Sequence, residues 1–106
     1  MEQKILDKIL SDHSLWLKNN NEGSRANLEG ANLSMANLDF SSFPLWCGTR
    51  NMIVDMKIVN QLLAHICALS CEADEFKTIK EIILPYAVNS HVAKPLGLIK
   101  EGKQNE

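Results

Sequence analysis

The sequence of 106 residues contains few aromatic residues, cysteines, prolines or glycines. Aromatic side chains make up only 6% of it, so its core must be mainly aliphatic. It also lacks the run of about eighteen uncharged apolar residues that a membrane-spanning helix needs. Its charges nearly balance at a formal net charge of −2, which excludes a strongly basic nucleic-acid-binding protein and a DNA mimic that works by high negative charge.

The remaining composition is that of a globular chain, with 45% hydrophobic and 23% charged residues. Its length suits one domain, which we place at residues 1–106. The N-terminal segment MEQKILDKIL has charges among its apolar residues, unlike a signal peptide. The three cysteines (Cys47, Cys67 and Cys71) are odd in number, so free thiols in the cytoplasm of a bacterial cell are expected.

Residues 3–18 predict an amphipathic helix. At helical spacing, the larger apolar residues and one histidine lie in a single stripe along the helix: Ile5, Leu6, Ile9, Leu10, His13, Trp16 and Leu17. The polar segment 19–23, which ends in glycine, should terminate this helix.

A second helical region is expected over residues 55–90. Residues 56–70 have a wide apolar face, and a further helix should begin at the acidic residues Glu72, Asp74 and Glu75. Pro85 should end or kink that helix near Leu84 because proline cannot donate the helical hydrogen bond. Residues 94–106 combine proline, glycine and charges, and we expect a flexible tail there.

The most informative stretch repeats every five residues. It consists of Ala26-Asn27-Leu28-Glu29-Gly30, Ala31-Asn32-Leu33-Ser34-Met35, Ala36-Asn37-Leu38-Asp39-Phe40 and a degraded Ser41-Ser42-Phe43-Pro44-Leu45. A period of five fits neither a helix nor a strand, so one structural turn must be reused. Asparagine suits such turns because its side chain bonds to nearby backbone. The residues expected to face the interior are Ala26, Leu28, Ala31, Leu33, Ala36, Leu38, Ser41 and Phe43.

This pattern over residues 25–45 resembles the pentapeptide-repeat family, with its motif A(D/N)LXX. The resemblance implies a right-handed quadrilateral β-helix in which four repeats make one coil. The chain would then have about one coil, capped by the helix at 3–18 and by the helical pair that follows. The expected fold class is therefore α+β. A single coil exposes apolar ends. We expect these ends to be covered either by the flanking helices or by a second copy of the chain stacked on the coil.

The arrangement as a whole is similar to small pentapeptide-repeat proteins of bacteriophages and prophages. The matching segments are His13-Ser14-Leu15-Trp16-Leu17, Pro44-Leu45-Trp46-Cys47-Gly48 and Leu63-Ala64-His65-Ile66-Cys67. No settled biochemical activity accompanies that arrangement, so it informs fold and origin more than mechanism.

Metal binding and thiol catalysis are both weakly supported. His65 and Cys67 would point about 200° apart on one helix, and therefore cannot chelate one zinc ion together with Cys71. Cys47 could pair with His65 or His91 as a nucleophile, but no third orienting group is evident. We therefore expect ordinary thiols, with no catalytic, cofactor-binding or metal-binding residue.

The remaining histidine and the two tryptophans have structural interpretations. His13 lies within an apolar stripe and is expected to pack there, hydrogen-bonded to backbone. Trp16 and Trp46 are expected to cover the ends of the coil, although either could also be an interface anchor.

These exclusions favour a non-enzymatic protein-binding module, of which an inhibitor of a host enzyme or of a defence complex such as a CRISPR system is one form. The expected contact residues are Glu29, Ser34, Asp39 and Trp46. One alternative is a DNA-mimicking inhibitor of DNA gyrase or another topoisomerase. This alternative is less favoured, because one coil is short and a net charge of −2 is small for an imitation of duplex DNA. The other is a self-assembling structural protein that forms a homodimer through the coil end. Neither a membrane nor direct nucleic-acid binding is expected.

Overall fold

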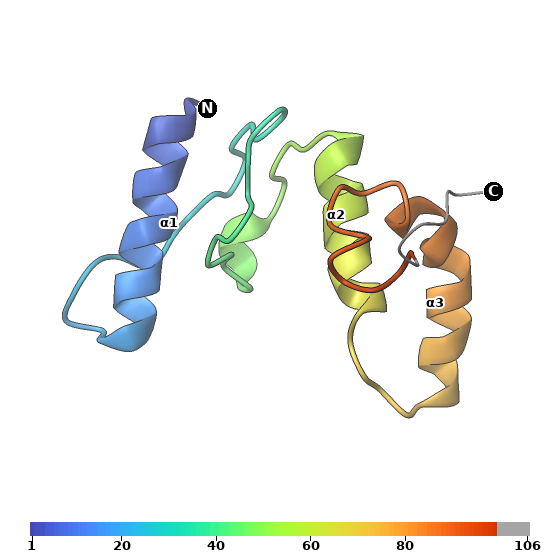
Figure 1. Cartoon of the computed structure of the whole chain (residues 1–106). Helices are drawn as coiled ribbons and strands as arrows, with labels where there is room; N and C mark the ends of the chain where they lie inside the picture. Colours follow the sequence, from blue (N-terminus) through green and yellow to red (C-terminus); the bar gives the residue numbers. More distant parts are fainter. Residues whose placement is uncertain (100–106) are drawn as a thin grey trace. The chain divides into compact units, whose positions relative to one another are not determined.

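The computed structural model describes residues 1–99, which divide between two compact units. The N-terminal unit is Met1–Asp55, and the C-terminal unit begins at Met56. In chain order the elements are the helix α1 (Gln3–Lys18), a short 3₁₀ helix η1 (Cys47–Thr49), and the helices α2 (Met56–Cys67) and α3 (Asp74–Ala87) (Figure 1). The described chain is thus mostly helical.

The expected α+β fold with a coil of β-helix is wrong. Residues 1–99 contain no β-strand and no sheet, and the repeats contribute only one isolated parallel bridge, between Asn32 and Ile53. Each repeat instead closes a tight turn by an N–H donated to the carbonyl three residues back: Ala31 to Leu28, Ala36 to Leu33 and Ser41 to Leu38. Turns at every fifth residue leave no extended run that could form a strand ladder.

A second segment lies beside the first repeats without forming a sheet with them. Residues 48–53 are joined to residues 28–33 by backbone hydrogen bonds of 2.7–3.0 Å. These bonds satisfy backbone groups of the first and second repeats. Because the paired segments are short, the local backbone conformation is set by the turns rather than by sheet pairing.

The asparagine at the second position of each repeat shapes its turn. Its side-chain Oδ1 accepts a hydrogen bond from the N–H two residues later, at 2.8–3.1 Å, in the pairs Asn27–Glu29, Asn32–Ser34 and Asn37–Asp39. The short side chain thereby replaces a backbone acceptor. The expected role of asparagine in these turns is confirmed.

Helix α1 occupies the range expected from its apolar stripe and buries Leu6, Leu10 and His13. Hydrogen bonds attach it to the repeats near both of its ends. The Gln3 side-chain amide both donates to the Asn37 carbonyl and accepts from the Asn37 N–H, each at 2.8 Å. Near the other end, His13 Nδ1 accepts the Ala26 N–H at 3.1 Å, which confirms the structural interpretation of this histidine.

The C-terminal unit is a pair of antiparallel helices, α2 and α3, with the following segment folded back onto them (Figure 1). Its core contains Ala64 and Cys67 of α2 and Ala87 of α3, with partly buried Leu63, Ile83, Leu84, Val92, Leu96 and Leu98 around them. The small alanine side chains allow the two helices to approach closely.

Two expectations for this unit concern its C-terminal part. Helix α3 does not end at Leu84 but continues through Pro85 to Ala87, because proline removes only one hydrogen bond near the helix end while Ala87 is fully buried. The expected flexible tail lies partly outside the described residues. In its described part, 94–99, Leu96 and Leu98 pack against the helix pair.

Candidate protein-interaction surface

The fifth position of each of the first three repeats lies at the tip of a turn and has a left-handed backbone conformation. Gly30, Met35 and Phe40 have φ values of 71°, 68° and 61°. Glycine adopts this conformation without strain, but a side chain with a Cβ atom is disfavoured there. The second and third repeats therefore place methionine and phenylalanine where the backbone favours glycine.

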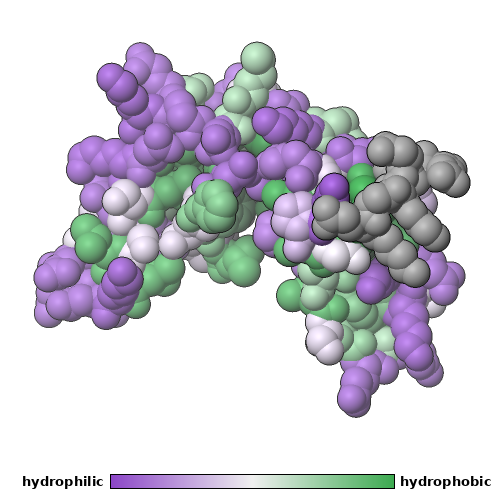
Figure 2. Space-filling view, in the orientation of Figure 1, coloured by the Kyte–Doolittle hydropathy of each residue, from purple (hydrophilic) through white to green (hydrophobic). Residues whose placement is uncertain are grey.

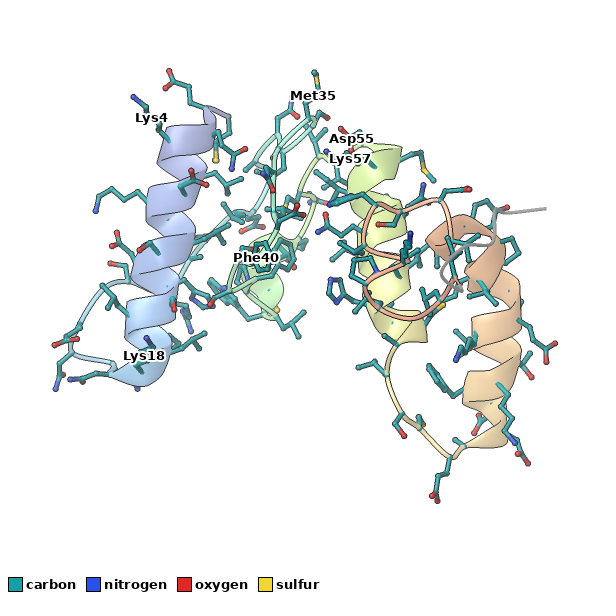
Figure 3. The ribbon with its side chains drawn as sticks, in the orientation of Figure 1. Lys4, Lys18, Met35, Phe40, Asp55 and Lys57 are labelled. Atoms are coloured by element: carbon teal, nitrogen blue, oxygen red, sulfur yellow. The ribbon has the colours of Figure 1, made fainter. Side chains whose placement is uncertain are left out.

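These two side chains are also among the most exposed in the described chain. Phe40 is fully exposed and Met35 is 88% exposed. Leu45, at the same position of the degraded fourth repeat, is 95% exposed. Figure 3 shows Met35 and Phe40 on separate turns of the repeat segment, and Figure 2 shows hydrophobic side chains at the surface among hydrophilic ones. We define the turn-tip surface as Met35 and Phe40, together with Leu45, which has the same repeat position but does not lie in a turn.

A shallow hollow of about 320 Å³ adjoins Phe40. Helix α1 contributes Asp7, Leu10, Ser11 and Ser14, and the turns contribute Asn37, Asp39, Phe40, Ser41 and Ser42. Seven of these nine residues have hydroxyl, amide or carboxylate side chains. It could accept a polar group of a partner beside the exposed ring.

Of the expected contact residues, Glu29, Ser34 and Asp39 are exposed. They occupy the position immediately before each turn tip. Glu29 already accepts a hydrogen bond from Arg50 Nε at 2.8 Å and forms an ion pair with that guanidinium. Its carboxylate thus helps to hold the segment after the repeats, whereas Asp39 lies next to the fully exposed Phe40.

The fourth expected contact residue, Trp46, is partly buried and has a structural attachment. Its indole N–H donates to the Ala26 carbonyl at 2.6 Å. The guanidinium of Arg25 lies over its ring, with Cζ 3.9 Å from the ring centroid. Trp16 of α1 lies on the same guanidinium at 5.8 Å and stacks with His13 at a centroid distance of 6.0 Å. We call Trp16, Arg25 and Trp46 the aromatic–arginine stack.

The residues expected to face the interior divide into two groups. Those buried in the structure are Ala26, Leu28, Leu33, Ala36 and Leu38. Those only partly buried are Ala31, Ser41 and Phe43. The repeats thus direct their central leucines inward, and burial weakens in the degraded fourth repeat.

The candidate chemical groups are distributed over both units. Cys67 is buried on α2, whereas Cys71 is exposed in the segment before α3. Burial raises the pKa of the Cys67 thiol, which disfavours its reactive thiolate form. Cys47 is exposed in the N-terminal unit, while His65 and His91 belong to the C-terminal unit.

No cluster of three or more potential ligands among His, Cys, Asp and Glu could hold a metal ion within residues 1–99. In the same part of the chain, no helix has the length and apolar character needed to cross a membrane.

The sequence analysis did not predict the turn-tip surface or the contacts of Arg25 with Trp16 and Trp46. The signal for the first was present: glycine in one repeat marks a position that tolerates left-handed backbone, and the next two repeats have large apolar residues there. The position of Arg25 had no such signal, because it depends on contacts among residues far apart in the chain.

Comparison with known proteins identifies no matching protein family, no matching curated protein and no matching solved structure.

Proposed function

We propose that this chain is a non-enzymatic protein-binding module whose contacts are made by the turn-tip surface. The observation that carries the proposal is Phe40, which combines a fully exposed aromatic ring with a left-handed backbone. A non-glycine residue in that conformation costs about 1–2 kcal/mol. Because the ring is exposed, it does not stabilise the fold and does not offset this cost. A role in binding would explain why phenylalanine occupies this position.

The chemistry around Phe40 suits a protein partner. Aromatic residues and methionine are enriched at protein interfaces. Met35 repeats the exposed apolar character on the preceding turn, and Leu45 repeats it in the segment that follows. The hollow beside Phe40 supplies hydroxyl and carboxylate groups that could bond to the polar rim of an interface. A module of this kind would act by covering a surface of its partner, as the expected inhibitor role requires.

The test compares the wild-type chain with Phe40→Asn. Asparagine tolerates left-handed backbone, so this substitution removes the ring without destabilising the turn. Leu17→Asn is the matched control, because Leu17 is also an exposed apolar residue but lies in the last turn of α1. Charge reversal at Glu29 would be a poorer probe, since it would also break the pair with Arg50.

Each tagged variant is used to capture proteins from nuclease-treated bacterial lysate, and the captured protein is then purified and titrated directly. We expect a stoichiometric partner whose affinity falls at least tenfold with Phe40→Asn and stays within twofold with Leu17→Asn. Recovery of no partner above the tag-only background would contradict the proposal. Equal affinity for the wild type and Phe40→Asn would exclude the turn-tip surface.

A further inference from the structure

The guanidinium of Arg25 is held in place before any ligand arrives. Its Cζ atom lies 3.9 Å from the ring centroid of Trp46 and 5.8 Å from that of Trp16. The backbone on both sides of Arg25 is attached to α1: the Ser24 N–H donates to the Asp12 carbonyl, and the Ala26 N–H donates to His13 Nδ1. Trp46 is tied to the same stretch of backbone through the Ala26 carbonyl.

Aromatic stacking uses the flat faces of a guanidinium and leaves its edge unused. Arginine has five N–H donors, all of which lie in the plane of the group. No hydrogen bond or ion pair joins the Arg25 guanidinium to any residue of the described chain, and the residue is exposed. Its donors are therefore available to an external acceptor.

Arg50, the second arginine of the sequence, shows the contrast. It forms an ion pair with Glu29 and therefore already has a carboxylate partner. One arginine thus has an internal carboxylate partner, whereas the other lies against two indole rings and has no ion pair within residues 1–99.

We propose that the aromatic–arginine stack is a binding site for a carboxylate side chain of a protein partner. A planar guanidinium binds a carboxylate through two parallel hydrogen bonds. Because its orientation is already fixed, less side-chain entropy is lost on binding. Tryptophan and arginine together are also the residue types most enriched among energetically dominant interface contacts.

The stack favours a carboxylate over a phosphate backbone. Nucleic-acid binding relies on several basic side chains that neutralise successive phosphates, whereas this stack supplies a single cation. The chain has a net charge of −2 and would repel an extended polyanion. One carboxylate matches the single cation of the stack. The inference rests on the proposed protein-binding function but uses a surface distinct from the turn tips.

The test follows the two arginine Nε–H signals by ¹⁵N NMR. The probe is a short peptide that contains one glutamate among alanines and is blocked at both ends, with inorganic phosphate in a parallel titration. We expect a saturable shift of the Arg25 signal with the peptide and little change at Arg50. Arg25→Lys, which keeps the charge but loses the planar fork, should weaken peptide binding at least tenfold. The matched variant Arg50→Lys should bind within twofold of the wild type.

A thermal melt of each variant establishes that the fold is retained. Equal shifts of both arginine signals, the absence of saturation, or tighter binding of phosphate than of peptide would overturn the inference. Binding of the captured partner to the variants distinguishes failure of the carboxylate site from failure of the proposed function. If Phe40→Asn weakens partner binding and Arg25→Lys does not, the binding module stands without a carboxylate site. If the peptide binds at Arg25 but no partner is captured, the carboxylate site stands and the proposed function fails.

Discussion

Replacement of Leu33 by alanine tests whether the inward leucines of the repeats form the core of the N-terminal unit. Leu33 is 0% exposed. Its N–H is bonded to the Ile53 carbonyl at 2.7 Å, and its own carbonyl closes the next turn at 2.9 Å. Backbone held on both sides cannot easily collapse into the space that the shorter side chain leaves, so a residual cavity should remain.

The expected loss is about 3 kcal/mol of unfolding free energy, within the range of about 2–5 kcal/mol for buried leucine-to-alanine changes. In a unit of this size, roughly 4–8 °C of melting temperature corresponds to each kcal/mol, so the midpoint should fall by roughly 12–24 °C. Urea unfolding followed by tryptophan fluorescence is the assay. Both tryptophans, Trp16 and Trp46, belong to the N-terminal unit and report on it selectively.

Met35→Ala is the control, because Met35 lies two residues away and is 88% exposed. It should change the free energy of unfolding by no more than about 0.5 kcal/mol, as is usual for surface substitutions. If Leu33→Ala were no more destabilising than Met35→Ala, the central leucines would not form this core.

Three further predictions concern single contacts. Gly23→Ala should destabilise the N-terminal unit by more than Gly30→Ala in the same urea assay. Both glycines have positive φ, but a Cβ at Gly23 would lie 2.1 Å from a backbone carbonyl of α1, whereas open space surrounds Gly30. Gln3→Ala should cost about 1–2 kcal/mol, because the side-chain amide makes two hydrogen bonds to the Asn37 backbone; an unchanged urea midpoint would refute that role. Because burial raises the pKa of the Cys67 thiol above its ordinary value of 9.0, the unfolded chain loses this proton first as the pH rises. The stability of the C-terminal unit, followed by circular dichroism, should therefore fall above about pH 9, and an equally steep fall in Cys67→Ala would contradict this assignment.

Several features could be predicted from the sequence because their causes are local. The bounds of α1 follow from an apolar stripe at helical spacing and from the glycine-containing segment after it. The turns follow from asparagine, whose side chain bonds to backbone only two residues away. The packing of His13 also followed, because a polar ring within an apolar stripe must find a hydrogen-bond partner.

The β-helix expectation failed for a physical reason. The five-residue period correctly indicated repeated turns, but a strand also needs an extended partner with which it forms a ladder of hydrogen bonds. Here the only described bridge joins Asn32 to Ile53, and each turn closes within its own repeat. Pro85 does not end α3, since it removes only one hydrogen bond near the last turn of the helix.

The sequence by itself determined where α1 lies, which residues make the turns, and that the central leucines point inward, since each depends on neighbours a few residues apart. Only the tertiary structure decided that Phe40 is left fully exposed and that Arg25 lies against both Trp16 and Trp46. The placement of Arg25 depends on hydrogen bonds that span 13 residues, from His13 to Ala26, and 20 residues, from Ala26 to Trp46. Contacts at such separations follow from the folded path of the chain, which local propensity and periodicity do not specify.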